Sequence, residues 1–330
     1  MRSQLQPTIT QRILPGLILG FVVVIGLMLL GDIQKVSRTI LQFRWETFFI
    51  ALGFTLFNYT LRFIKWHFYL GQIGASRITA AQSMKLFVAG FPLAVTPGKV
   101  GEVFKAVWLM RQTGIPVGRG ASVVVAERIS DGLAVLALSI LGVIAYPQFW
   151  PVFGVILGVL LSLIIVSQIR PLATWLLDQG EKIKILRRVS LTLREFYEGS
   201  FALFRPGVTL LAVLLGTVSW VGEGVGFFYI LSGLGLAPTE KLLAMAIFVL
   251  AFSTVVGAAS ALPGGLGAAE VSIAGLITLT LHQDPAISTT ATVLIRLATL
   301  WFGVGLGLLV WLFSPDLFGL VRQTEQVTEA

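Results

Sequence analysis

Residues 151–169 read PVFGVILGVLLSLIIVSQI, a run that contains no charged side chain. A helix of about 20 apolar residues, rising 1.5 Å per residue, crosses the roughly 30 Å hydrocarbon core of a bilayer. Five further stretches have the same character, and they cover residues 13–31, 47–66, 121–146, 207–232 and 288–313. The sequence therefore predicts an all-α, polytopic integral membrane protein with about six full transmembrane helices.

The composition of the whole chain agrees with this prediction. Apolar residues make up 56% of the 330 residues and charged residues 12%, with a mean hydropathy of +0.89, whereas soluble domains carry about 25% charged residues. These values exclude a soluble globular enzyme, a disordered chain and a nucleic-acid-binding arm. A porin-type barrel is excluded because the apolar runs are continuous and not alternating. Residues 13–31 show no small-residue cleavage site, so we interpret them as a retained span and not a signal peptide.

Two further apolar regions, 80–111 and 241–281, are each interrupted near the middle. Proline removes a backbone donor and glycine frees the backbone, so a helix stops at each interruption. Broken helices at membrane depth persist only where protein or a water-filled cavity covers them, and we expect two re-entrant hairpins. The predicted helix breaks are Pro97, Gly98 and Gly101 in the first region, and Pro263, Gly264, Gly265 and Gly267 in the second.

The two halves of the chain resemble each other in the order of their features. Segment 68–87 aligns without gaps onto 229–248, and the two Pro-Gly breaks coincide after a five-residue insertion. Further along, Arg128 corresponds to Arg296. Each match alone is weak, but their common order indicates an internal duplication.

The chain is predicted to form a single transmembrane domain, 1–330, built from two halves and a polar connection. Apolar residues recur at near-helical spacing among the basic residues of that connection, which is typical of a cytoplasmic amphipathic helix lying on anionic headgroups. A solvated linker whose basic residues only set the topology explains the pattern equally well. The expected parts are a first half at about 13–169, the amphipathic linker at 170–205, a second half at 206–313 and a short tail at 314–330.

Basic residues indicate the orientation of the chain. The net charge is +8, from 24 basic and 16 acidic residues, and most of the excess lies in short loops. With re-entrant hairpins and a cytoplasmic N-terminus, 14 loop residues, Lys65 among them, lie on the cytoplasmic side and 4 on the other. With single crossings instead, the best division is 12 to 6. The positive-inside rule favours the hairpins, and because these enter from opposite sides, it predicts inverted halves.

Little in the sequence indicates catalysis. Cysteine is absent, and the two histidines, His67 and His282, lie far apart in the sequence. No HExxH, GxSxG, Walker or GxGxxG motif occurs. We therefore expect no enzymatic activity, no metal and no cofactor.

Charged residues inside the apolar segments are the candidate site. An ionised group in hydrocarbon costs several kcal/mol or more, so such groups face protein or water. The free N–H groups of a half-helix that starts after Pro97-Gly98 would attract a phosphate or carboxylate. Arg296 has no acid within four residues on its own helix, and it points most strongly to an anionic ligand. The predicted substrate pathway consists of Lys99, Glu102, Glu127, Arg128, Asp131, Glu223, Glu270 and Arg296.

Structural explanations remain open for these charges. The lysines near the first break can extend to the membrane interface, and acids can neutralise bases within the bundle without any ligand. The pairs that we consider are Glu102 with Lys99 or Lys105, Arg128 with Asp131, Glu223 with Arg62, and Arg296 with Glu270, Glu223 or a substrate phosphate.

Three segments, TPGKVGEVFKAVWL (96–109), VVAERISDGLAVL (124–136) and LPGGLGAAE (262–270), are similar to hallmark segments of a known family. The chain resembles the lysylphosphatidylglycerol synthase transmembrane-region family, which includes the flippase half of the bacterial multiple peptide resistance factor. We expect the protein to lack the aminoacyl-transferase domain of the two-part members, so the resemblance implies lipid translocation and not aminoacyl transfer. The family's motif positions correspond to Pro97, Gly98, Gly101, Glu102, Glu127, Arg128, Asp131, Pro263, Gly264, Gly265, Gly267 and Glu270.

We therefore expect a flippase-like transporter that translocates an anionic or polyprenyl-phosphate-linked lipid between leaflets. The headgroup would pass between the two breaks while the tails stay in lipid. Two alternatives are a membrane subunit that assists a separate lipid- or sugar-modifying enzyme, and an ion-coupled transporter of a small anion. The expected partners are membrane lipids with anionic headgroups and, in the first alternative, that enzyme; nucleic acid is not expected. The expected location is the plasma membrane, with both termini cytoplasmic.

Overall fold

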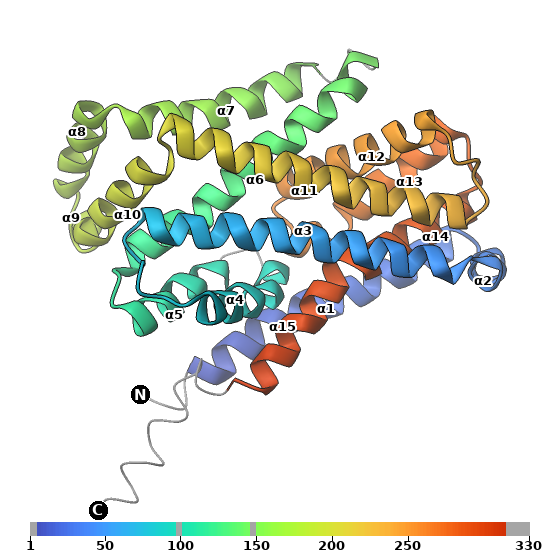
Figure 1. Cartoon of the computed structure of the whole chain (residues 1–330), viewed down its shortest axis with the longest axis horizontal. Coiled ribbons are helices and arrows are strands. Elements are labelled where there is room, and N and C mark those ends of the chain that lie inside the picture. Colours follow the sequence, from blue (N-terminus) through green and yellow to red (C-terminus); the bar gives the residue numbers. More distant parts are fainter. Residues whose placement is uncertain (1–4, 97–100, 146–149, 315–330) are drawn as a thin grey trace, which may run out of the picture.

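The computed structural model describes residues 5–96, 101–145 and 150–314, and all regular elements in these ranges are helical (Figure 1). In chain order the elements are α1 (Leu5–Leu30), α2 (Ile33–Gln42), α3 (Trp45–Gln72), α4 (Ala80–Ala89), η1 (Phe91–Val95), α5 (Phe104–Thr113), α6 (Val117–Ala145), α7 (Trp150–Gln168), α8 (Arg170–Glu181), α9 (Lys184–Arg187), α10 (Ser190–Leu203), α11 (Pro206–Gly233), α12 (Glu240–Ala259), η4 (Pro263–Gly265), α13 (Ala268–Leu281), α14 (Pro285–Arg296), η5 (Leu297–Trp301) and α15 (Phe302–Leu312).

Several of these helices have the length and composition of membrane spans. Five helical segments meet this measure: α3, α11, α12, Pro263–Leu281 and Pro285–Leu312. Two bent pairs also meet it, since α1 turns into α2 by 96° and α7 into α8 by 91°. The prediction of an all-helical, polytopic membrane protein is confirmed. Each stretch predicted as a full span lies in helix, with ends that differ by up to eight residues. The helix over 121–146, α6, is not among the segments that meet this measure.

The helices α3 and α11 lie side by side through the middle of the molecule and share its most extensive helix interface (Figure 1). Small residues on α11 make the close approach possible. A β-carbon at Gly222 would lie only 2.7 Å from the Phe57 ring of α3. Such small-residue contacts let helix backbones pack tightly in membranes, where no hydrophobic force drives the helices together. The α3–α11 pair therefore provides a rigid wall for what packs beside it.

The second Pro-Gly region is a true break between two helices. Gly264, Gly265 and Gly267 have φ angles of +61°, +68° and +88°, a left-handed range that only glycine adopts readily. The chain reverses through these residues, so α12 and α13 pack against each other as a hairpin. By length, both arms can cross a membrane.

The first broken region has shorter arms, and its turn lies partly outside the described residues. Pro97, Gly98 and Lys99 belong to that undescribed part. The 3₁₀ turn η1, just before it, packs against η4, and the Val95 side chain lies 3.3 Å from the place of a β-carbon at Gly264. The two interruptions of the sequence therefore adjoin each other in the folded chain.

The polar connection between the halves folds into α8, α9 and α10, which gather at one end of the molecule, opposite α2 (Figure 1). Helix α10 packs along the start of α6, where a β-carbon at Gly118 would lie 2.2 Å from the Thr192 carbonyl oxygen. An ion pair of 2.7 Å between Arg119 and Glu195 joins the same helices. The segment in which the sequence indicated an amphipathic helix or a solvated linker thus contains a helix docked on the bundle.

Candidate functional site

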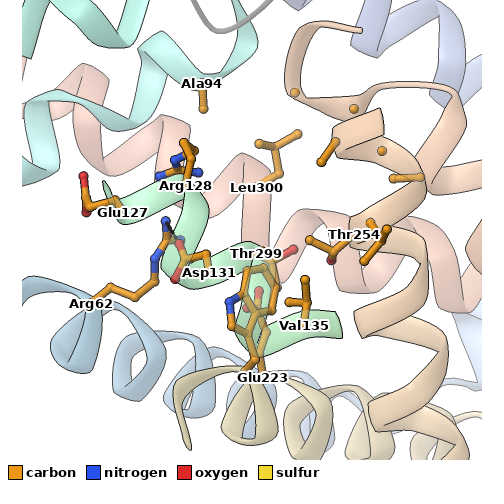
Figure 2. Close-up of a pocket in the computed structure, with 18 of the residues that line it drawn as sticks. Arg62, Ala94, Glu127, Arg128, Asp131, Val135, Glu223, Thr254, Thr299 and Leu300 are labelled. Carbon is orange, nitrogen blue, oxygen red and sulfur yellow. Dashed lines mark ion pairs between the residues drawn. The ribbon is translucent and has the colours of Figure 1, made fainter. Parts of the chain in front are cut away.

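A cavity of about 570 Å³ lies where α3, α6, α11, α12 and the two breaks converge (Figure 2). It reaches the protein surface, because the Arg128 side chain is 36% exposed and Ala258 and Ala259 are exposed. Its charged lining residues are Arg62, Glu102, Lys105, Glu127, Arg128, Asp131, Glu223 and Arg296.

The cavity has a charged end and an apolar end. Along α6 the lining changes from Glu127, Arg128 and Asp131 to Val135 and Leu136 within about two helical turns. Figure 2 shows the charged groups of α6 and Arg62 gathered on one side, with Val135 and Thr254 on the other. The apolar wall is completed by α7 and α12, through Ile156, Leu160, Leu250 and Val255.

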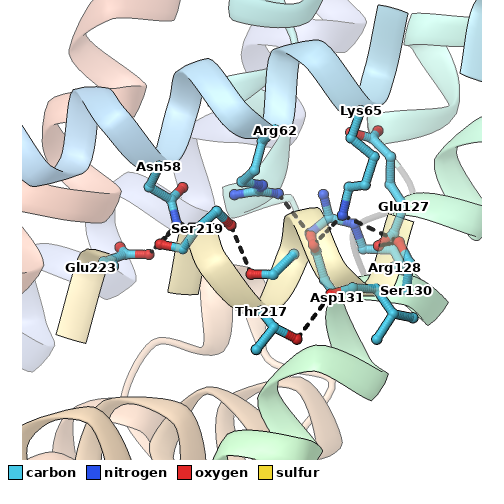
Figure 3. Close-up of polar contacts among 12 residues, drawn as sticks. Asn58, Arg62, Lys65, Glu127, Arg128, Ser130, Asp131, Thr217, Ser219 and Glu223 are labelled. Carbon is cyan, nitrogen blue, oxygen red and sulfur yellow. Dashed lines mark hydrogen bonds and ion pairs between the residues drawn. The ribbon is translucent and has the colours of Figure 1, made fainter. Parts of the chain in front are cut away.

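Asp131 joins two cations of α3 at the charged end (Figure 3). Its carboxylate lies 2.5 Å from Lys65 Nζ and 3.2 Å from a terminal nitrogen of Arg62. Lys65 is fully buried within α3, so it is not the loop residue that the count of basic residues took it to be. Helix α3 extends to Gln72, beyond the expected end of this span, and Asp131 neutralises the buried ammonium. Removing one residue from the cytoplasmic total leaves the basic bias in place.

Lys105 of α5 forms a second buried ion pair. Its Nζ lies 2.9 Å from a Glu127 oxygen and 3.8 Å from the centre of the Trp66 ring. An ammonium over an aromatic face is attracted by the ring quadrupole, and more so when desolvated. Lys105 therefore joins α5 to α6 and α3. Of the two partners considered for Glu102, Lys105 pairs with Glu127 instead, and Lys99 lies outside the described residues.

Arg128 is turned toward Glu102, whose carboxylate lies 3.4 Å from Arg128 Nε. The expected bridge from Arg128 to Asp131 does not form, because Asp131 is already occupied by cations of α3. A guanidinium carries five N–H donors, so among the residues that the structure describes, this one long contact leaves most of the Arg128 donors available to the cavity.

Arg296 pairs with Glu270, which is one of the three partners considered for it. Its Nε lies 2.5 Å from Glu270 Oε1, and a terminal nitrogen donates to the Gly264 carbonyl at 2.9 Å. Of the candidate partners, Glu270 is the one that contacts Arg296 in the structure. That carboxylate also accepts from the Gly267 backbone N–H at 2.6 Å, which places it behind the lining. Directly after Arg296 the helix widens into the π-helical turn η5, a feature frequent at functional sites.

Glu223 lies on α11 at the edge of the charged end. Its Oε2 accepts a hydrogen bond of 2.9 Å from Asn58 Nδ2 (Figure 3). The expected bridge to Arg62 is absent, since Arg62 pairs with Asp131. No ion pair joins Glu223 to any residue within 5–96, 101–145 or 150–314.

The predicted helix-break residues are distributed around the cavity. Gly264 and Gly265 line it directly. Gly101, Pro263 and Gly267 are not lining residues, and the Gly101 N–H donates to Thr96 Oγ1 at 2.9 Å. Pro97, Gly98 and Lys99 lie outside the described residues. In the part of the chain that the structure describes, no three metal-binding side chains converge.

The sequence analysis missed Asn58, Lys65 and Tyr59. Together with Arg62, the first two occupy positions i, i+4 and i+7 of α3, which places them on one helix face. Tyr59 donates from its hydroxyl to the Thr299 carbonyl of η5 at 2.7 Å. Asn58 and Lys65 could have been identified from the sequence, because with Arg62 they form a polar stripe of helical period inside an apolar span.

Comparison with known proteins identifies relatives along nearly the whole chain. Residues 17–307 match the family described as the lysylphosphatidylglycerol synthase TM region. The chain is also 26% identical over 332 residues to a UPF0104 membrane protein of Methanothermobacter thermautotrophicus, with 92% of this chain and 94% of that protein covered. No solved structure matches the chain significantly. The chain therefore belongs to the lysylphosphatidylglycerol synthase transmembrane-region family, as its motifs indicated.

Proposed function

We propose that this protein is a flippase-like transporter that moves an anionic or polyprenyl-phosphate-linked lipid between leaflets. The observation that carries the proposal is the division of the cavity into a charged end and an apolar end. A lipid headgroup needs cations and hydrogen-bond donors when it leaves water, whereas its chains need apolar surface. A small soluble anion would contact the charged end of the cavity only.

Two arginines supply the anion-binding chemistry of the proposal. Arg128 and Arg296 both line the cavity, and guanidinium groups bind phosphate bidentately. Within the described residues each keeps donors beyond its ion pair, since Arg128 makes one ion pair there, at 3.4 Å, and Arg296 uses Nε and one terminal nitrogen. A phosphate seated between them would be held in the water-poor interior.

The proposal includes two halves of inverted topology, with six full spans and re-entrant hairpins at 80–111 and 241–281. Helices α3 and α11 support it, because each has 28 residues and their starts lie 161 residues apart. Asn58 and Ser219, also 161 residues apart, are joined by a hydrogen bond of 3.0 Å. Equivalent positions meet in this way where a pseudo-twofold axis passes between repeats.

Two glutamate–arginine pairs also support the proposal of two inverted halves. Glu102 and Arg128 form a pair whose members are 26 residues apart, and Glu270 and Arg296 form another with the same separation. Each glutamate follows a Pro-Gly break. An ion pair with the same spacing therefore occurs once in each half.

A leaflet-resolved assay tests the function. Protein reconstituted into vesicles should move headgroup-labelled phosphatidylglycerol or a polyprenyl phosphate faster than labelled phosphatidylcholine. Thr254→Trp fills part of the cavity and should slow the movement, whereas Val155→Trp, at a site 66% exposed on α7, should not. Equal rates for both variants and wild type would contradict the proposal. Release of a small anion without any lipid movement would favour the ion-coupled alternative.

A further inference from the structure

Glu223 differs from the other acids around the cavity. Glu102, Glu127, Asp131 and Glu270 each have a cation partner between 2.5 and 3.4 Å away. Glu223 has none among the described residues, although it is only 7% exposed and lines the cavity. A buried carboxylate without a cation is strongly disfavoured in its ionised form.

The described groups around Glu223 supply no cation that pairs with its carboxylate. Both arginines that face it are already engaged, Arg62 with Asp131 and Arg296 with Glu270. The charged and titratable groups facing Glu223 are Tyr59 and Arg62 from α3, Asp131 from α6 and Arg296 from α14, while the lining residues Leu250, Ser253 and Thr254 of α12 carry no charge.

Asn58 can accommodate either protonation state of Glu223. Its Nδ2 donates to the carboxylate at 2.9 Å, and its Oδ1 is buried without a hydrogen-bond partner. Nδ2 also donates to the Ser219 carbonyl at 3.0 Å, which holds the amide in this orientation. Its bond to Glu223 suits either protonation state, because the C=O oxygen of a protonated carboxyl group still accepts a hydrogen bond. The hydrogen bond from Asn58 is therefore compatible with Glu223 whether or not it carries a proton.

Charge balance connects this proton to the substrate. Over the described residues, the lining charges and their buried partners Lys65 and Glu270 comprise five cations and five acids. They cancel when Glu223 is ionised and leave one positive charge when it is protonated. We infer that Glu223 is a proton-binding site whose protonation recruits a phosphodiester monoanion, so that one proton and one anionic headgroup occupy the cavity together.

This inference rests on the proposed function and adds its coupling ion. Proton and headgroup binding are reciprocal, because a ligand that prefers the protonated protein must raise its proton affinity equally. Anion affinity therefore falls as pH rises through the titration of Glu223. A proton gradient across the membrane then drives the lipid in the direction in which protons flow.

Binding measurements on the purified full-length protein test the inference. The probes are dioctanoyl phosphatidylglycerol and its soluble headgroup glycerophosphoglycerol, both monoanions from mildly acidic to mildly alkaline pH, with dioctanoyl phosphatidylcholine as the neutral comparison. Wild type should bind the lipid monoanion more tightly as pH falls, by as much as about tenfold per pH unit. Glu223→Gln should bind at all pH values as wild type does at acidic pH. Glu240→Gln, at an exposed position, should keep the wild-type slope.

A second measurement needs no variant and covers the case in which Glu223→Gln fails to fold. Phosphatidylglycerol added to wild type in weakly buffered solution should cause uptake of up to one proton per bound lipid, and no uptake at any pH overturns the inference. A wild-type slope in Glu223→Gln also overturns it, but leaves the proposed function standing. If wild type binds neither monoanion better than phosphatidylcholine at any pH, the proposed function fails as well. Binding of glycerophosphoglycerol as tight as that of the lipid would identify a soluble phosphodiester as the source of the headgroup.

Discussion

Arg296 and Glu270 are joined by a charged hydrogen bond of 2.5 Å between Nε and Oε1, on two helices that meet at the second break. The second oxygen of Glu270 accepts from the Gly267 N–H, and Arg296 itself donates to the Gly264 carbonyl. The pair therefore fixes the turn between α12 and α13 and at the same time presents an arginine to the cavity. Structural and transport roles of this arginine can be separated by substitution.

Arg296→Lys should keep the protein folded and reduce lipid movement. Lysine retains the charge opposite Glu270 but loses the planar fork that reaches Glu270, Gly264 and a phosphate together. Arg296→Ala should stop transport and lower the free energy of unfolding by about 3–5 kcal/mol, because Glu270 is then buried without a cation. Thermal unfolding measured beside the translocation rate separates the two effects.

Arg296→Ala/Glu270→Ala is the control for that interpretation. Removing both charges should restore part of the stability that the single arginine variant loses, without restoring transport. If Arg296→Lys and Arg296→Ala both fold normally and both move lipid at the wild-type rate, Arg296 plays no part in anion binding.

Sequence reasoning predicted the helices and the embedded charges and named Glu270 among the partners of Arg296, but the other charge pairs differ from those considered. Spans and breaks depend on local composition, so 151–169 and Pro263-Gly264 could be assigned directly. Pairing depends on which helix faces meet, and the expected Arg128–Asp131 bridge was wrong because α3 brings two other cations to Asp131. A bundle contact of this kind leaves no trace in the spacing along one helix.

Lys65→Met should destabilise the protein strongly. The ammonium of Lys65 is fully buried and lies 2.5 Å from Asp131, so the substitution leaves this buried carboxylate with Arg62 alone. We expect a loss of about 3 kcal/mol in the free energy of unfolding, measured by denaturation in mild detergent. Lys35→Met, at an exposed position of α2, should change it by less than about 0.5 kcal/mol. Equal effects of the two variants would mean that Asp131 is satisfied without Lys65.

Gly118→Ala should loosen the docking of α10 on α6. The new β-carbon would lie 2.2 Å from the Thr192 carbonyl oxygen, and backbone cannot yield as a flexible side chain does. Overpacking of this kind costs about 1–3 kcal/mol, visible as a lower melting temperature. Gly154→Ala, where nothing lies within 4 Å of the new carbon, should instead be neutral or stabilising by up to about 1 kcal/mol. Identical melting temperatures for the two variants would show that α10 is not held against α6.

Single cysteines should report opposite sides for the loops that end α5 and α13. The chain has no cysteine of its own, so Gln112→Cys and Gln283→Cys each introduce one thiol without background. Inverted halves place residue 112, beside the basic loops, in the cytoplasm and residue 283 outside, because basic loops are retained on the cytoplasmic side. In intact cells, a membrane-impermeant maleimide should label Gln283→Cys at once and Gln112→Cys only after the membrane is opened. Ser190→Cys, in the basic connection at the start of α10, should behave like Gln112→Cys. Labelling of Gln112→Cys and Gln283→Cys from the same side would contradict the inverted arrangement of the two halves. Arg128 and Arg296 could then no longer be treated as equivalent positions.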